Sequence, residues 1–239
     1  VTGVQTCALP ISLTVLNCAR VFGAADRVVV GVMGTGGRGT ALVEKFAARP
    51  DVSIAWLCDP DSRRHGPARQ LVEKAQGRAP KCVQDFRQML ADKSVDAVVN
   101  AAPDHWHALG TILACQAGKD VYVEKPMAHN VWEGRKMVEA ARKHKRVVTV
   151  GMQTRSASYV AKAIEILRSG RLGEIHQVRV LNQMLHPMNK PSDRPPAAEV
   201  DYELWCGPAA KPANNAIPTW LSFFEYSCGP IPEIGRAHV

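Results

Sequence analysis

A glycine-rich turn is the first pattern in the sequence with an evident chemical use. It follows Arg27–Met33, an apolar and β-branched run that predicts a buried strand, and it precedes the helix-like segment Gly39–Ala48. In a G-x-G-x-x-G turn, the glycines permit a tight bend, approach of a pyrophosphate to the backbone, and close packing of helix on strand. The first amide groups of the helix attract phosphates. We therefore expect six residues to form a dinucleotide site: Gly34, Thr35, Gly36, Gly37, Arg38 and Gly39.

An acidic residue, Asp59, follows the next strand-like run, Val52–Cys58, and lies twenty residues beyond the last glycine of the turn. At this place a carboxylate binds the hydroxyls of the adenosine ribose. Asp59 could instead, or in addition, cap the predicted helix Asp61–Ala75. A carboxylate also repels a 2′-phosphate, since two like charges ~4 Å apart cost about 4 kcal/mol at an effective dielectric of 20. The sequence thus favours NAD over NADP, although Arg63 and Arg64 would soften that preference.

Two further polar segments follow strand-like runs. The segment APDHWH, residues 102–107, comes after Val95–Asn100, and the segment EKP, residues 124–126, ends the run Val121–Glu124. Ligands of doubly wound sheets bind outside the carboxyl ends of the strands, so both segments should open on the cleft beside the glycine turn. Each has a plainer interpretation alone, as a Lys-Pro turn or a histidine capping a helix. Their joint placement favours a functional site.

The order of the predicted elements indicates an α/β fold with a doubly wound, parallel, Rossmann-type sheet over residues 27–150. Further strands are expected at Lys81–Val83 and Val147–Val150. The helix Asp61–Ala75 is predicted with an interruption at Gly66-Pro67, and Asn130 is predicted to cap a helix that ends near His144. After residue 150 the pattern changes, with a helix at Tyr159–Arg168 and an alternating strand at Ile175–Met184. Residues 151–233 are accordingly expected to form a truncated α+β substrate domain.

These motifs together resemble the Gfo/Idh/MocA (glucose–fructose oxidoreductase/inositol dehydrogenase) family, whose members carry a glycine-rich turn, a TP(N/D)xxH segment and an EKP segment. The resemblance runs from Arg27 to about Gly229. It implies an NAD(P)-dependent oxidoreductase that moves a hydride between the nicotinamide and a hydroxyl-bearing carbon of a sugar or cyclitol. It also implies that Lys125 lies beside the nicotinamide as the catalytic residue and hydrogen-bonds the reacting substrate oxygen.

Roles for other residues follow from the same resemblance. Pro103, Asp104 and His107 would line the cofactor cleft, and Glu124 would hold the nicotinamide ribose. The segment containing Gln153 and Arg155 resembles the family's GxQxR and would face the substrate. Residues 205–208 resemble a W-x-GP loop to which no role is assigned.

The sequence departs from the family's pattern in one place. Members of the family usually carry a D-x-G-x-H-x-x-D segment whose histidine acts as acid or base beside the lysine. Here Tyr226–Pro230 resembles the approach to that segment, but the chain then passes into IGRAHV. His238 lies in that string, so we expect the catalytic histidine to be missing.

Two other functions remain open. Some relatives resemble NAD-dependent glycosidases, which oxidise a sugar transiently to allow elimination. A non-catalytic NAD-binding module is the other alternative; the retention of Lys125 argues against it, but it would suit a chain that lacks the histidine.

The expected partner is a small sugar or polyol substrate, and the full-length protein is expected to form a homo-oligomer. The basic run at residues 142–146 ends a predicted helix, which indicates a solvated terminus rather than a nucleic-acid site.

The two terminal segments, residues 1–11 and 234–239, resemble translations of a sequencing adapter, and we expect them to be foreign to the protein. Residues 12–26 are either a lead-in to the first strand or the remnant of a twin-arginine leader, so a cytoplasmic and an exported protein are both compatible with the sequence. The seven cysteines include no CxxC pair, and no metal site is predicted.

Overall fold

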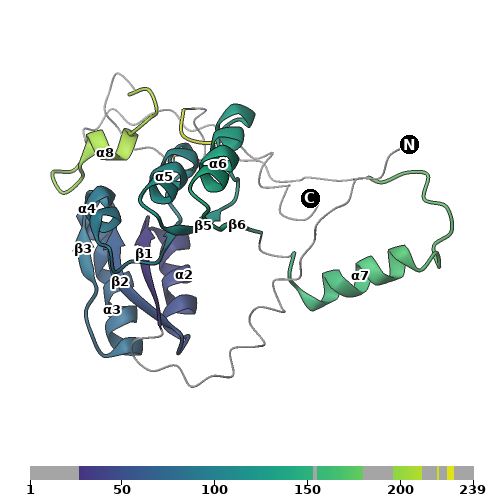
Figure 1. The fold of residues 1–239 in the computed structure, drawn as a ribbon, viewed down its shortest axis with the longest axis horizontal. Helices are drawn as coiled ribbons and strands as arrows, with labels where there is room; N and C mark the ends of the chain where they lie inside the picture. Colours follow the sequence, from purple (N-terminus) through teal and green to yellow (C-terminus); the bar gives the residue numbers. More distant parts are fainter. Residues whose placement is uncertain (1–26, 153–154, 180–195, 212–219, 221–224, 229–239) are drawn as a thin grey trace.

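The computed structural model describes residues 27–152, 155–179, 196–211, 220 and 225–228. Its central feature is a six-stranded sheet in the order β3-β2-β1-β4-β5-β6 (Figure 1). Every neighbouring pair of strands is parallel. The chain order reverses between β1 and β4, which is the switch point of a doubly wound fold. The predicted fold class is confirmed. The strands are β1 Val28–Met33, β2 Val52–Cys58, β3 Lys81–Val83, β4 Ala97–Asn100, β5 Asp120–Glu124 and β6 Val148–Gly151.

Helices cover both faces of the sheet. On one face, α2 (Gly37–Ala47) and α3 (His65–Gln76) pack against β1 and β2 through Leu42, Val43 and Val72. On the other face, α4 (Phe86–Ala91), α5 (Asp104–Gln116) and α6 (Val131–Lys143) form a second apolar cluster with the strands. The strands are therefore buried on both sides, which explains why their sequences read as continuous apolar runs.

The region after β2 differs from its prediction. A short 3₁₀ turn, Ser62–Arg64, precedes α3, and Gly66-Pro67 does not interrupt the helix. Pro67 lies in the first turn of α3, where a missing backbone N–H costs nothing. The side chain that caps the 3₁₀ turn is that of Asp61, which accepts the N–H of Arg63. Asp59 is therefore not the cap, and the alternative structural role proposed for it is wrong. By contrast, Asn130 caps α6 as predicted and accepts the N–H of Glu133.

The described part beyond residue 154 is less regular. Helix α7 (Ser158–Arg168) has no buried residue, and Figure 1 shows it standing apart from the sheet. Residues 175–179 are not a strand, so this part of the predicted strand Ile175–Met184 is wrong, and the remainder lies outside the described residues. A strand needs a neighbour to pair its backbone, and none of the described residues pairs with this segment. The expectations for residues 1–26, for Gln153 and for the segment after Cys228 also fall outside the described residues.

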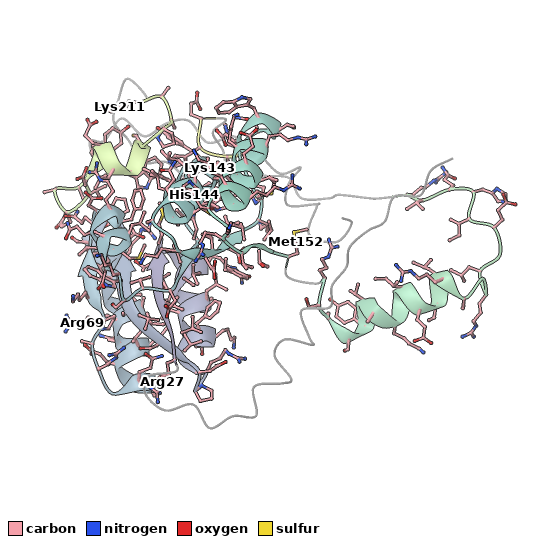
Figure 2. The ribbon with its side chains drawn as sticks, viewed as in Figure 1. Arg27, Arg69, Lys143, His144, Met152 and Lys211 are labelled. Carbon is pink, nitrogen blue, oxygen red and sulfur yellow. The ribbon has the colours of Figure 1, made fainter. Side chains whose placement is uncertain are left out.

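A last helix, α8 (Tyr202–Cys206), returns to the sheet. It belongs to residues 196–211, which pack with Tyr226 in a small apolar cluster of their own. Figure 1 shows α8 beyond the ends of the strands, close to α4. In Figure 2, Lys211 at the end of this segment lies above the sheet, whereas Arg27, which precedes β1, lies below it. The segment therefore covers the carboxyl ends of the strands.

Candidate cofactor-binding site

Two glycines of the turn are required by its geometry. Gly34 has a φ of 86°, and a Cβ atom there would lie 2.6 Å from the carbonyl oxygen of Ala101. A Cβ atom on Gly39 would lie 1.8 Å from the carbonyl oxygen of Gly34. The turn after β1 is thus pressed against both the loop after β4 and the first turn of α2, and neither contact leaves space for a side chain.

The other two glycines face open space. Gly36 is the N-cap of α2 and supplies no side-chain hydrogen bond to the helix. A Cβ atom on Gly37 would meet nothing within 4 Å, and one on Gly36 would meet only the guanidinium of Arg64, 3.5 Å away. The first amide groups of α2 therefore face a cradle, which suits the pyrophosphate of a dinucleotide.

Asp59 connects the glycine turn to the end of β2. Its Oδ2 accepts the backbone N–H of Thr35 at 2.8 Å, and its Oδ1 accepts the N–H of Asp61 at 3.0 Å. The residue is only 7% exposed, and burial raises the pKa of its carboxyl, although the two amide donors and the charge of Arg64 oppose that shift. A carboxylate has further lone pairs, so Asp59 can still accept ribose hydroxyls.

A cavity of about 460 Å³ lies in front of these groups, within the usual range for a cofactor site. Of the residues predicted from sequence, those that line it are Gly34, Gly36, Gly37, Arg38, Asp59 and Pro103. Thr35 and Gly39 do not line it, and each supports a neighbour that does. The structure thus places the turn, Asp59 and the loop after β4 around one space.

Glu124 ends β5 on the other side of the switch point. Its Oε1 accepts a hydrogen bond from Arg38 Nη2 at 2.7 Å, so an ion pair joins the glycine turn to the EKP segment. Glu124 is 3% exposed, and none of the described residues hydrogen-bonds its buried Oε2. A buried carboxylate oxygen without a donor is costly. Glu124 does not line the cavity; a hydroxyl donor placed beside this oxygen would satisfy it.

Asp104 and His107 are buried within the first turns of α5 and do not line the cavity. Asp104 Oδ2 accepts hydrogen bonds from the Ser227 hydroxyl at 3.1 Å and the Cys228 N–H at 3.2 Å. Burial raises the pKa of Asp104, while the nearby charges of His107 and Lys125 lower it. Lys125 therefore lies close to Asp104, directly after β5.

The side chain of His107 connects two loops of the sheet. Its Nδ1 lies 2.5 Å from the carbonyl oxygen of Pro126, and its Nε2 lies 2.8 Å from that of Ala102. With both ring nitrogens engaged and 1% of the residue exposed, the imidazole connects the loop after β4 to the loop after β5. Arg155 is exposed and does not line the cavity either.

The cavity also contains side chains that sequence reasoning did not assign to a site. They are Gln84, Phe86, Trp106, Leu204, Trp205 and Trp220; Arg64, which was expected to affect the choice between NAD and NADP, lines it as well. The resemblance of residues 205–208 to a W-x-GP loop could have indicated some of these residues. The sequence alone, however, did not show that this loop lies beside the sheet.

Among the helices of the described residues, none has both the length and the apolar character that a membrane span requires. Among the same residues, no group of three or more His, Cys, Asp or Glu side chains is arranged to hold a metal ion.

Comparison with known proteins agrees with this geometry. The chain is 34% identical over 127 residues to a glycosyl hydrolase family 109 protein of Solibacter usitatus, covering 49% of the chain and 29% of that protein. It is 31% identical over 153 residues to an inositol 2-dehydrogenase of Rubrobacter xylanophilus, covering 63% and 42%. The chain thus spans less than half the length of these relatives.

Solved structures resemble it as well. The WlbA dehydrogenase of Bordetella pertussis, in complex with NADH and UDP-GlcNAcA, matches with a TM-score of 0.54 and 27% identity, covering 62% of this chain and 43% of that one. A family model described as an oxidoreductase family with an NAD-binding Rossmann fold matches residues 28–152. The chain belongs to this family, the Gfo/Idh/MocA oxidoreductases.

Proposed function

We propose that the protein is an NAD-dependent oxidoreductase that transfers a hydride between the nicotinamide and a hydroxyl-bearing carbon of a sugar or cyclitol. The observation that carries the proposal is the arrangement of three groups at the carboxyl ends of strands of one parallel sheet, on both sides of the switch point. The glycine turn follows β1, Asp59 follows β2, and Glu124 with Lys125 ends β5. An ion pair between Arg38 and Glu124 links the first group to the third.

Each part of the cofactor has residues that suit it. The pyrophosphate would lie at the start of α2, and the adenosine ribose would bind Asp59. The unpartnered Oε2 of Glu124 would accept a hydroxyl of the nicotinamide ribose. When bound, the nicotinamide supplies the hydride chemistry. Lys125 would hydrogen-bond the substrate oxygen and transfer its proton, with Gln153 and Arg155 facing the substrate.

The names of the relatives support this substrate class. One is an inositol 2-dehydrogenase, and WlbA is a dehydrogenase seen with NADH and a nucleotide sugar. The division at residue 150 into a cofactor domain and a substrate domain, and assembly as a homo-oligomer, are part of the same proposal.

A second candidate is an NAD-dependent glycosidase. It is favoured by the 34% identity to a glycosyl hydrolase family 109 protein. Such an enzyme oxidises and then reduces the same sugar, so it produces no net NADH. Release of an aglycone without accumulation of NADH would therefore identify it.

The test places Lys125→Ala, at the matching lysine, in a full-length relative, and incubates the relative and its variant with NAD and with myo-inositol, aldoses or aryl glycosides. We expect NADH to accumulate with a cyclitol or sugar in the unchanged full-length enzyme. We expect Lys125→Ala to lower kcat by about 10²–10⁴, since it removes a proton-transfer group, and to leave the Kd of NAD unchanged. Lys136→Ala, on the surface of α6, is the matched control. An unchanged rate for Lys125→Ala would contradict the proposed role. NAD binding without any turnover would favour a non-catalytic module.

A further inference from the structure

We propose that Leu204 and Trp205, together with Trp220, form the wall of the pocket that holds the adenosine half of the cofactor. The inference rests on the proposed use of NAD and gives a role to the W-x-GP segment, which the proposed function leaves unused. This wall comes from a part of the chain that lies more than 120 residues beyond the end of β3, the later of the two strands that it faces.

The side of the sheet identifies the adenosine half. Asp59 follows β2, and Gln84 and Phe86 follow β3, so this part of the cavity lies on the β2–β3 side of the switch point. In a doubly wound fold, the acidic residue after β2 binds the adenosine ribose. Glu124 and Lys125 lie on the other side, at the end of β5. Leu204 and Trp205 line the cavity that contains Asp59, so they face the adenosine.

Backbone hydrogen bonds fix the wall to the loop that carries Asp59. The N–H of Asp201 donates to the carbonyl of Pro60 at 2.9 Å, and the N–H of Ser62 donates to the carbonyl of Glu199 at 3.2 Å. The Gln84 amide donates to both of these carbonyls, at 2.8 and 3.0 Å. The wall and the ribose-binding loop therefore form one unit.

Contacts with the start of α5 hold the other side of the wall. The indole N–H of Trp106 points at the carbonyls of Leu204 and Trp205, at 3.0 and 3.2 Å, and His105 Nε2 lies 3.0 Å from the Trp205 carbonyl. The Trp205 ring packs against Tyr226, with centroids 4.8 Å apart. Trp205 is thus held in a fixed orientation at the edge of the cavity.

The composition of the wall matches the proposed ligand. Adenine presents a flat apolar face, and aromatic side chains contact such faces without regard to hydrogen-bonding pattern. The cavity carries aromatic rings from three separate segments, namely Phe86, Trp106 and Trp205, with Trp220 as a fourth. Asp59 and Arg64 line the same cavity and supply polar groups for the ribose and phosphates.

The test compares NAD and AMP as calorimetric ligands of the full chain, because AMP contains the adenosine half alone. We expect Leu204→Ala and Trp205→Ala to weaken both ligands by the same factor, roughly tenfold for Trp205→Ala and less for Leu204→Ala. Leu204 is only half-buried, so its truncation should preserve the fold if Trp205→Ala does not. Glu203→Ala is the matched control, since Glu203 is exposed on the same helix and should leave both affinities unchanged.

The outcomes separate this inference from the proposed function. If the parent chain binds NAD and AMP and both variants bind them equally well, the wall is refuted while the proposed function stands. A loss of NAD affinity without a loss of AMP affinity would also refute it. If the parent binds neither ligand, both proposals fail.

Discussion

The amino and carboxyl ends of the parallel sheet carry similar polar residues, but these residues differ in their burial and in their hydrogen bonds. At the amino end, polar groups pair with each other: Asp96 accepts the N–H of Val29 at 2.7 Å, and Gln76 bonds the backbone of Val52 and Ile54. At the carboxyl end, Asp59 also accepts two backbone N–H groups, but it is buried with a raised pKa, and Glu124 has a buried oxygen without a donor. We infer from this difference that the amino end serves folding, whereas the carboxyl end suits a ligand.

The largest effect is expected within the glycine turn. Gly39→Ala should lower the free energy of unfolding by about 3 kcal/mol or more, because the new methyl group meets the Gly34 carbonyl. Gly37→Ala, two residues away, should raise it by about 0.5 kcal/mol, since its Cβ meets nothing. Urea unfolding of the ligand-free variants measures both. Equal effects would show that the turn is not packed as described.

The next-largest effects compare one substitution at the amino end of the sheet with one at the carboxyl end. Gln76→Ala leaves backbone groups of β2 unpaired and should cost about 1–3 kcal/mol of stability without changing the Kd of NAD. Asp59→Asn should do the reverse: it should weaken NAD binding and cost less stability than Gln76→Ala, because the burial cost of a charge disappears while the amide keeps one oxygen to accept a backbone N–H. Denaturation and calorimetry on the same two variants test this. Parallel losses in both measurements would show that the two ends are not separate in function.

The smallest effect concerns acid stability at the amino end. Hydrogen bonds from the Ser94 hydroxyl and amide and from the Trp56 indole lower the pKa of Asp92 from 3.8 to about 2. A lowered carboxyl pKa contributes stability above pH 3.8 that is lost as the pH falls toward 2. Because Asp92 is in contact with solvent, its contribution should stay below about 1 kcal/mol. Asp92→Asn should therefore lose less stability than the parent between pH 5 and pH 3 in urea titrations. Curves of identical pH dependence would argue against these hydrogen bonds.

The sheet and its glycine turn were predictable because the signals are local. Val52–Cys58 is a continuous apolar run, and its predicted bounds match β2. The cavity wall was not predictable in the same way, because Trp205 reaches it through contacts with residues about 100 positions earlier. His107 is a case in which a local motif led to an incorrect prediction. The motif predicted that His107 lines the cofactor cleft, but both of its ring nitrogens contact backbone carbonyls, those of Pro126 and Ala102.

The strand predicted at Ile175–Met184 was wrong over residues 175–179 for a physical reason. Alternating apolar residues describe one face of a strand, but a strand forms only where another strand pairs with it. Helix α7 was predicted from its own periodicity and is present at Ser158–Arg168, yet it buries none of its residues. The local sequence pattern was therefore enough to predict the helix, whereas a strand depends on pairing with another segment of the chain, which the local pattern does not show.

The most direct test of the central claim is calorimetric titration of the chain with NAD and with NADP at neutral pH. We predict that NAD binds at least about tenfold more tightly, since the Asp59 carboxylate accepts ribose hydroxyls and repels a 2′-phosphate. We also predict that the preference shrinks in Asp59→Ala and at lower pH, where the carboxyl, with its raised pKa, takes up a proton. Tighter binding of NADP, or binding of neither dinucleotide, would contradict the central claim.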